Sequence, residues 1–408
     1  MIKPLRGAAS VAVGLISPHG SRHERDQEAG LSHLAEHMYF QGTRRRDNRE
    51  LSRVINAVGG TLDAYTSREA AAFYPKVPAA HFSLALDVLA DMFAASRFDP
   101  VLLEKEKRII LEEIRMYEDE PEDRVHERFA RTLWPRHGLG RPILGFRRVL
   151  RNVRRGDLTA FVRRHFQPRD LIMAVAGRVD PDDAEDSVRR LFASLPNHPG
   201  RPNGGPPAPP PAAGAGLERR DYEQVHLCLG CQGIAYQDPR RAAVVGLANI
   251  LGGGTHSRLF YEVRERRGLA YSVYTFMDFY RDTGSFGVYA ACSPSKVFET
   301  LEVLKTELRR VVDRTVSEQE LTDLKEQLRG NLLLSLENTS THMWRMVQHE
   351  SYLGRQESVA QTLRAIERLT RNDIRSIARE LLLQRPLAIS AVGNLPRKQE
   401  RLLDFSLV

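Results

Sequence analysis

Two histidines and a glutamate lie within five residues near the start of the chain: His33, Glu36 and His37, in the segment H-L-A-E-H. On a helix, positions three and four apart share a face, so both imidazoles and the carboxylate would point the same way. Two neutral imidazoles can hold a zinc ion, and a carboxylate beside them can take a proton from water. The order H-x-x-E-H, the reverse of the zinc motif H-E-x-x-H, therefore predicts a hydrolytic metal site.

The same five residues could also have no metal-binding role, because such a pattern arises by chance. Paired histidines on a helix also occur as solvated surface side chains or as hydrogen-bonded core side chains. The flanking residues favour a site: Gly30-Leu31 precedes the motif and Met38-Tyr39-Phe40 follows it, so its surroundings are apolar. Zinc also needs a third protein ligand. Glu113 is the best candidate, since residues 103–119 carry strong helix formers without Gly or Pro. Glu106 lies seven residues earlier and shares the face of Glu113.

Several further motifs accompany this site and make a family resemblance visible. They are Gly14-Leu-Ile, Gly20-Ser-Arg22, the run Gly30 to Thr43, the run Gly59 to Glu69, Ile110 to Ile114 and Leu251 to Phe260. With them the chain resembles the M16, or pitrilysin-type, zinc peptidases. It is most similar to the short two-domain branch that includes bacterial processing proteases and the mitochondrial processing peptidase.

The resemblance implies a role for each residue of the site. His33, His37 and Glu113 would bind Zn²⁺, Glu36 would be the general base, and Glu106 would orient the ligands. In the second half, Arg264 and Tyr271 would bind substrate carbonyls and stabilise the developing oxyanion. The substrate would be a peptide or an unfolded protein segment held in a chamber between two domains. It would lie extended as an added strand, with Gly60, Asp63 and Ala64 in the strand that receives it.

The organisation of the chain indicates a duplication. Residues 196–216 are rich in Pro, Gly and Ala and predict a linker between domains at 1–195 and 217–408. Matches recur at a constant offset of 216: Gly14 with Gly230, Asp157 with Asp373, and Gly177 with Gly393. We therefore expect an α+β protein of two homologous domains, each a largely antiparallel sheet with helices packed on one face.

The two halves differ chemically, and two positions depart from the family pattern. At the offset of 216, His33 falls on Asn249 and His37 on Gly253, so the second half lacks this metal site. Asp63 stands where relatives usually carry Asn, which replaces a donor-acceptor amide by an anion. Relatives also carry a strand before the one that contains Gly14. We expect that strand to be missing here, which would expose a sheet edge.

Composition narrows the possible classes of protein. The 408 residues include no run of 18 apolar residues, and the first ten lack an apolar signal region, which predicts a cytoplasmic protein without a membrane span. The net charge of +8 is scattered along the chain, so we expect no nucleic-acid partner. Cys228 and Cys231 fall in a predicted strand, where residues three apart face opposite sides, so we expect no metal or redox site there.

Three functions remain open from the sequence. The first is an active zinc endopeptidase with both half-sites in one chain, acting as a homodimer. The second is a substrate-binding or scaffolding subunit in a heterodimer with a related chain. The third, a nucleic-acid-binding protein, has only the basic composition in its favour. The presence of His33, Glu36, His37, Glu106 and Glu113 favours the first.

Overall fold

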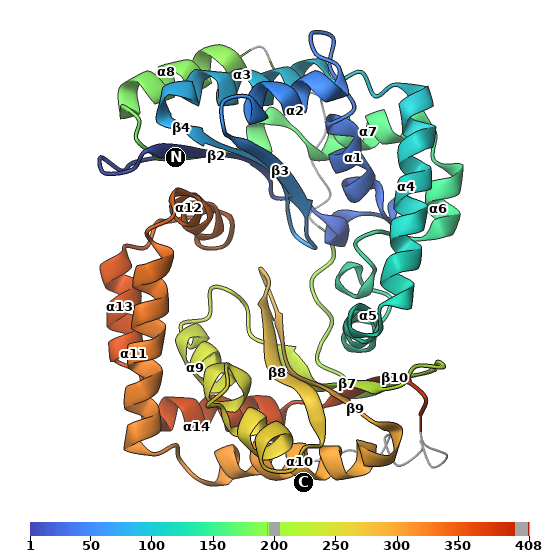
Figure 1. Ribbon diagram of the computed structural model, residues 1–408, viewed down its shortest axis with the longest axis vertical. Coiled ribbons are helices and arrows are strands. Elements are labelled where there is room, and N and C mark those ends of the chain that lie inside the picture. The colour runs from blue at the N-terminus through green and yellow to red at the C-terminus, as the bar shows by residue number, and fades with distance from the viewer. Residues whose placement is uncertain (194, 196–204, 396–406, 408) are drawn as a thin grey trace. The chain divides into compact units, whose positions relative to one another are not determined.

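The computed structural model describes residues 1–193, 195, 205–395 and 407. The chain forms two compact units (Figure 1). The first contains Met1–Arg115, Arg141–Pro206 and Leu333–Gln356, and the second contains Met116–Gly140, Pro207–Leu332 and Glu357–Val408. Much of the linker expected at 196–216 lies outside the described residues. The last three residues of that range belong to strand β6 (Gly214–Arg219).

The sheet of the first unit has the order β1-β5-β2-β4-β3. Only β1 and β5 run parallel, and the other neighbours are antiparallel. The strands are β1 (Ile2–Pro4), β2 (Ser10–Ser17), β3 (Thr61–Thr66), β4 (Ala71–Pro78) and β5 (Ile172–Gly177). The expectation of a missing first strand is wrong in part, because β1 covers the edge of β5 with three residues.

Helices cover both faces of this sheet. The helices of the first unit are α1 (Leu31–Tyr39), α2 (Asn48–Asn56), α3 (Phe82–Ala95), α4 (Pro100–Asp119), α6 (Arg147–Asn152), α7 (Arg155–His165), α8 (Pro181–Phe192) and α12 (Thr339–Leu353). Helix α4 belongs to this unit up to Arg115. Single helical turns lie at Ser21–His23, Asp26–Glu28, Ala79–His81 and Pro168–Asp170. One face of β2 (Val11, Val13, Leu15) joins the main core. The other face packs against Met343 and Val347 of α12.

The sheet of the second unit repeats this topology with the order β6-β10-β7-β9-β8, in which only β6 and β10 run parallel. Its strands are β6 (Gly214–Arg219), β7 (Val225–Gly233), β8 (Ala270–Phe279), β9 (Gly284–Cys292) and β10 (Ala388–Gly393). Its helices are α5 (Pro121–Leu133), α9 (Arg241–Gly252), α10 (Val297–Asp313), most of α11 (Glu318–Ser335), α13 (Val359–Glu367) and α14 (Arg371–Arg379), with further turns at Gly138–Gly140, Phe260–Glu265, Pro294–Lys296 and Glu380–Gln384.

The α+β class and the duplication are confirmed, and two of the three matched pairs of positions have matched physical roles. Asp157 and Asp373 each accept a hydrogen bond from the backbone N–H three residues earlier, which caps α7 and α14. Gly177 and Gly393 end β5 and β10 with positive φ angles of 147° and 137°. A side chain at either position would collide with backbone of the neighbouring strand.

The prediction that helices cover only one face of each sheet is wrong. Helix α5, which precedes the linker in sequence, packs on the sheet of the second unit through Val125 and Phe129. Helix α12, which follows it, packs on the sheet of the first unit. Each of these helices buries an apolar stripe on the sheet face that the other helices leave uncovered. The compact units therefore differ from the predicted domains 1–195 and 217–408, which are continuous in sequence.

Candidate metal centre

Helix α1 presents the H-x-x-E-H motif on one face and core residues on the other. Leu34, Ala35 and Met38 are fully buried and join the main core. The start of the helix is held by Glu24, whose carboxylate accepts hydrogen bonds from the backbone N–H groups of Gly30 (2.9 Å) and Ser32 (2.7 Å). These bonds satisfy N–H groups that a helix leaves unpaired at its first turn. The position of His33 therefore follows from both packing and capping.

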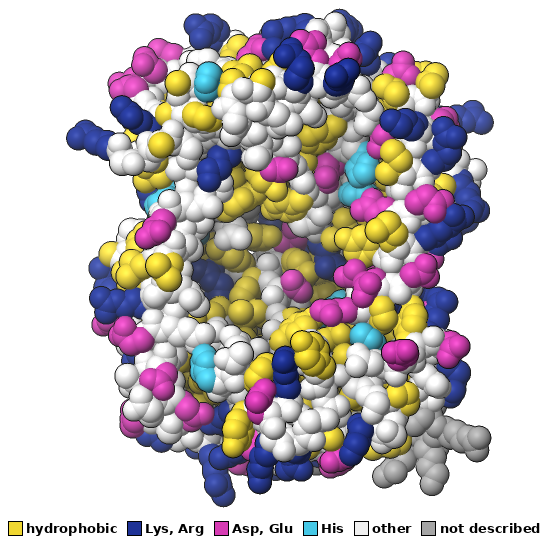
Figure 2. All heavy atoms as spheres, in the orientation of Figure 1, with side chains coloured by type: hydrophobic (Ala, Val, Ile, Leu, Met, Phe, Trp, Pro, Cys, Tyr) yellow, Lys and Arg dark blue, Asp and Glu magenta, His cyan; other side chains and the backbone are white. Residues whose placement is uncertain are grey.

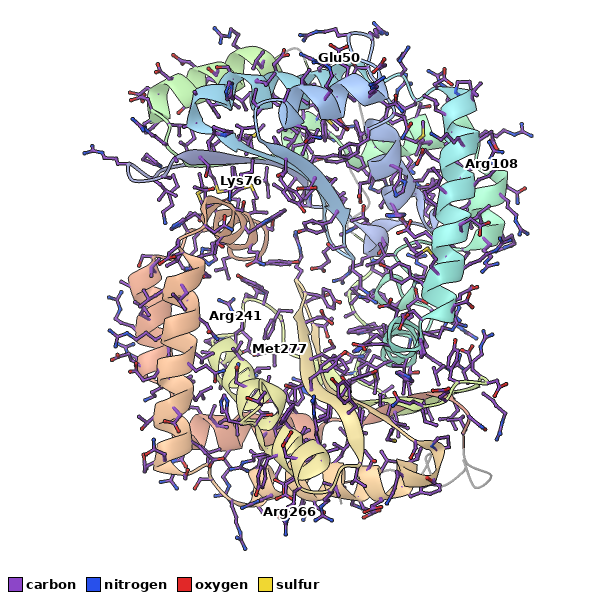
Figure 3. All side chains as sticks on the ribbon, in the orientation of Figure 1. Glu50, Lys76, Arg108, Arg241, Arg266 and Met277 are labelled. Atoms are coloured by element: carbon purple, nitrogen blue, oxygen red, sulfur yellow. The ribbon has the colours of Figure 1, made fainter. Side chains whose placement is uncertain are left out.

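Helix α4 supplies two carboxylates from one face. Leu103, Ile110 and Ile114 are buried in the same core cluster as the apolar residues of α1. Glu106 is buried, with 4% of its surface exposed, whereas Glu113 is half-buried. Figure 3 shows Arg108 pointing away from α1, on the opposite side of α4. The seven-residue spacing expected from the sequence thus brings both carboxylates to the side of α4 that faces the histidines.

The structure brings His33, His37 and Glu113 together. One ligand atom from each of the three side chains lies within 4.8 Å of the other two. Nε2 of His33 and Nε2 of His37 are each 3.9 Å from a carboxylate oxygen of Glu113. A tetrahedral zinc ion with bonds of about 2.1 Å would set its ligand atoms about 3.4 Å apart. The three ligand atoms would therefore have to move closer together by about 0.5 Å or more to bind the ion. Their chemistry fits zinc, because two imidazoles and a carboxylate are a donor set that zinc uses.

Glu106 contacts the ring nitrogen of His37 that points away from Glu113. Nδ1 of His37 donates to Oε2 of Glu106 at 3.0 Å, which leaves Nε2 as the nitrogen for a metal. No protein partner for Nδ1 of His33 occurs among the described residues. The structure therefore places Glu106 beside one of the two histidines, in the position that an orienting carboxylate would take.

Burial and charge set the protonation of this group of residues. Burial, together with the neighbouring His37, lowers the pKa of His33 to about 3, so its imidazole is neutral at physiological pH. Burial alone would lower the pKa of His37, but the hydrogen bond and charge of Glu106, with the charges of Glu113 and Glu36, raise it overall. Burial raises the pKa of Glu36, and a hydrogen bond from Thr66 opposes that shift.

The outer strand of the sheet runs beside the motif. Strand β3 is an edge strand of the described sheet, and its residues alternate between exposed and half-buried. Ala64 packs toward the core, whereas Asp63 is exposed. Gly60 has a structural role of its own, because a Cβ there would lie 2.8 Å from the carbonyl oxygen of Lys76.

Arg264 and Tyr271 belong to the second unit and contact each other there. The guanidinium of Arg264 lies 4.3 Å from the centre of the Tyr271 ring and donates to the Tyr271 carbonyl oxygen at 3.1 Å. The Tyr271 side chain is 72% exposed, which is high for an aromatic residue. The pair therefore presents a phenol and a guanidinium to solvent within one unit.

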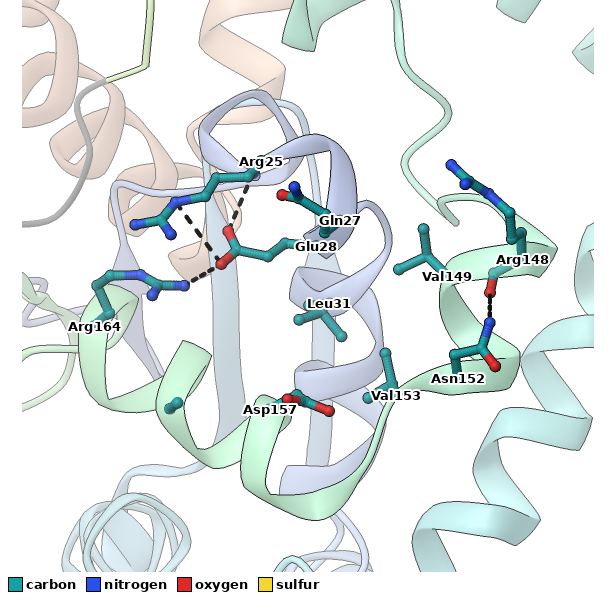
Figure 4. A pocket seen from close by; sticks show the side chains of 11 residues that line it. Arg25, Gln27, Glu28, Leu31, Arg148, Val149, Asn152, Val153, Asp157 and Arg164 are labelled. Carbon is teal, nitrogen blue, oxygen red and sulfur yellow. Dashed lines mark hydrogen bonds and ion pairs between the residues drawn. The ribbon is translucent and has the colours of Figure 1, made fainter.

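A separate cavity of about 670 Å³ lies beside the N-terminal end of α1 in the first unit (Figure 4). Glu28 lies between Arg164 and Arg25 in its wall and forms ion pairs with both. Asp157 and Arg148 also line it, so its charges are mixed. None of the three ligand candidates lines this cavity, and it is distinct from the metal centre.

Surface charge, helix length and the cysteines relate to the other predictions made from the composition. Figure 2 shows Lys and Arg side chains interspersed with Asp and Glu on the face drawn. None of the helices in the described part of the chain is both long and apolar enough to cross a membrane. Cys228 and Cys231 are free thiols on β7 and belong to different core clusters, so the expected opposite orientation is confirmed.

Comparisons with known proteins identify the family of this chain. Residues 4–146 match the model described as insulinase (peptidase family M16), and residues 152–328 match the model described as the peptidase M16 inactive domain. A Streptomyces coelicolor protein named an uncharacterized zinc protease is 38% identical over 97% of this chain and 87% of its own. A Bacillus subtilis protein of the same description is 36% identical over 95% of this chain and 94% of its own. This chain belongs to peptidase family M16.

Solved structures share the fold at lower identity. A protease from Helicobacter pylori matches with a TM-score of 0.90 and 20% identity, over 96% of each chain. A structure described as the peptidase M16 inactive domain from Pseudomonas fluorescens matches with a TM-score of 0.90 and 22% identity, over 97% of this chain and 95% of its own. These structures confirm the fold, and the family models with the curated relatives confirm the resemblance to the M16 family that the sequence motifs carry.

Sequence reasoning missed one polar contact of the motif. Oγ1 of Thr66 donates to Oε2 of Glu36 at 2.5 Å, although the two residues are 30 positions apart. Thr66 falls within the motif Gly59 to Glu69, but nothing in its residue type distinguishes it from the other threonines. Only the alternation of β3, which turns Leu62, Ala64 and Thr66 to the same side, would have indicated it.

Proposed function

We propose that this protein is a zinc metalloendopeptidase that hydrolyses peptide bonds in peptides or unfolded segments. The observation that carries the proposal is the convergence of His33, His37 and Glu113 on one point, with Glu36 on the same face of α1. Two imidazoles and one carboxylate are a donor set used by catalytic zinc sites. The zinc-protease names of relatives in S. coelicolor and B. subtilis support the same chemistry.

In this proposal each side chain of the site has one task. Zinc supplies Lewis acidity, which lowers the pKa of water toward neutrality and polarises a carbonyl group. His33, His37 and Glu113 hold the ion, and Glu106 fixes the tautomer and ring orientation of His37. Glu36 accepts the proton from the attacking water and delivers it to the leaving amine. Burial raises the pKa of Glu36, which suits a group that must both take and give a proton near neutral pH.

The substrate contacts are proposed from the edge strand and from the second unit. A peptide in extended form would pair with β3, whose outer backbone groups are not used by another strand of the described sheet. Asp63 and Ala64 lie in that strand, and the exposed Asp63 would add a negative charge beside the peptide. Arg264 and Tyr271 would donate to substrate carbonyls, a role that rests on the family motif and on their pairing and exposure.

The proposed function is tested by zinc content and peptide cleavage of wild type and Glu36→Gln. We expect wild type to hold one zinc per chain and to cleave unstructured peptides. Glu36→Gln should keep the zinc and lose turnover, because Gln cannot accept the proton. Glu112→Gln, which changes an exposed carboxylate of α4, is the matched control and should remain active.

Two results would contradict this proposal. Cleavage by Glu36→Gln at the wild-type rate would remove Glu36 as the base. A wild-type chain that cleaves only after a related second chain is added would favour the role of a subunit in a heterodimer over that of an enzyme complete in one chain.

A further inference from the structure

The motif glutamate has a hydrogen-bond partner that the proposed mechanism does not use. Thr66 lies at the end of β3 and donates its hydroxyl proton to Oε2 of Glu36 at 2.5 Å. A hydroxyl bound to a carboxylate is a charge-assisted hydrogen bond and is stronger than a neutral one. The hydrogen bond from Thr66 occupies Oε2 of Glu36. Among the described residues, none donates a hydrogen bond to the other carboxylate oxygen, Oε1.

The position of Thr66 is fixed by the tight turn that follows it. Thr66 pairs with Ala71 across β3 and β4, and the intervening turn is closed by the bond from Ser67 N–H to the Ala70 carbonyl at 2.7 Å. The Ser67 hydroxyl also accepts from the Ala70 N–H at 3.0 Å. The backbone that carries Thr66 is therefore held from within the hairpin.

A second segment of the first unit holds the same turn from outside. Ser21 N–H donates to the Ser67 carbonyl at 3.1 Å, and Arg22 N–H donates to the Arg68 carbonyl at 2.8 Å. The Arg22 guanidinium forms a buried ion pair with Glu69 at 2.5 Å, in which both side chains are less than 10% exposed. A buried ion pair with hydrogen bonds around it fixes geometry closely, because breaking it leaves an uncompensated charge.

We infer that Thr66 is a positioning residue for Glu36: it fixes the rotamer of the carboxylate and directs Oε1 to the water that loses a proton. The inference rests on the proposed function, because it assigns Glu36 the role of general base. Thr66 itself touches no reacting atom. Its effect is on the orientation of Glu36, and a shift of about 1 Å in a reacting group is enough to cost about 10²-fold in rate.

Thr66→Val removes the hydroxyl and keeps the shape and the strand preference of the side chain. We expect kcat to fall by about 10²-fold, with KM and zinc content close to wild type, because neither backbone pairing nor the ligands change. Thr66→Ser restores the hydroxyl and should recover most of kcat. If Thr66→Val folds poorly, Thr66→Ala removes the same donor with less bulk.

Thr43→Val is the matched control in the same unit. Thr43 donates to a buried carboxylate of Asp91 at 2.8 Å and also accepts from the backbone N–H groups of Arg45 and Arg46. Its removal costs more hydrogen bonds, so it should lower the melting temperature at least as much while kcat stays unchanged. An equal loss of kcat in Thr43→Val and Thr66→Val would mean that stability, not positioning, is measured, and would overturn the inference.

A crystal structure of zinc-loaded Thr66→Val gives a test that does not depend on turnover. We expect Glu36 in a changed or mixed rotamer, with the zinc ligands in place. A Glu36 carboxylate in the wild-type position, or a wild-type kcat in Thr66→Val, would overturn the role of Thr66. A wild-type chain that holds zinc but cleaves nothing would instead overturn the proposed function, and the rotamer of Glu36 would still decide the question for Thr66.

Discussion

His37 and Glu106 meet between α1 and α4, with Nδ1 of the imidazole 3.0 Å from Oε2 of the carboxylate. Glu106 is the more buried of the two, so solvent screens little of its charge. The bond leaves Nε2 of His37 directed toward Glu113. One carboxylate of α4 thus orients a histidine, while another, seven residues later on the same face, completes the candidate ligand set.

This relationship predicts the effect of replacing Glu106. Glu106→Gln keeps a hydrogen-bond acceptor of the same size but removes the charge that would make His37 a stronger ligand. We expect zinc affinity to fall by about 10–100-fold, measured by competition with a chromophoric chelator. Glu112→Gln, at an exposed position of α4, should bind zinc as wild type does. Unchanged affinity in Glu106→Gln would show that its contact with His37 does not influence the metal.

Two buried histidines outside the metal centre predict the response to acid. Burial, with the charges of His19 and Arg22, lowers the pKa of His23 to about 3, and burial, with His19 and Arg164, lowers that of His165 to about 3. Since histidine in an unfolded chain takes its proton near pH 6.5, the unfolded state binds more protons below that pH. The first unit should therefore be most stable above about pH 6.5, and its free energy of unfolding should decline as the pH falls toward 3.

The size of this decline is measurable by denaturant unfolding at several pH values. Each such histidine should lower the free energy of unfolding by about 2 kcal/mol between pH 6.5 and 5. His165→Phe, which preserves the ring contact with Phe161, should lose about that much of the pH dependence. His256→Gln, at an exposed position, should keep the wild-type slope. An identical slope in His165→Phe would show that His165 is protonated alike in the folded and unfolded chain.

The repeated strand ends predict matched effects in the two units. Gly177→Ala and Gly393→Ala each place a Cβ against the backbone of the adjacent strand, at φ angles that side chains rarely adopt. Each should lower the free energy of unfolding by about 1–3 kcal/mol. Gly156→Ala, in the first turn of α7 with no atom within 4 Å of the new Cβ, should raise it by about 0.5–1 kcal/mol. A neutral effect at Gly177 or Gly393 would contradict the shared constraint.

Local sequence patterns were sufficient for the parts of the site that lie on single helices. His33, Glu36 and His37 fall within two turns of α1, and Glu106 with Glu113 fall within three turns of α4, so helical spacing alone predicted which side chains share a face. The duplication was accessible for a related reason, although the strand order within each sheet was not predicted. The constant offset of 216 gave the duplication, and the two sheets have the same strand order.

Contacts between distant segments could not be predicted in the same way. The hydrogen bond from Thr66 to Glu36 and the ion pair of Arg22 with Glu69 depend on how a hairpin meets a helix and a turn. The packing of α5 on the second sheet and of α12 on the first depends on which sheet face remains uncovered. The apolar stripe of a helix does not by itself indicate which sheet the helix will cover. Strand β1 was missed because three residues are too few for an alternation pattern.

Anomalous diffraction on either side of the zinc absorption edge, from crystals of the zinc-loaded protein, tests the metal centre most directly. The structure predicts one strong zinc peak, about 2.0–2.2 Å from Nε2 of His33, Nε2 of His37 and a carboxylate oxygen of Glu113. A zinc-loaded crystal with no peak among these three side chains, or with its zinc bound elsewhere, would contradict the assignment of this site.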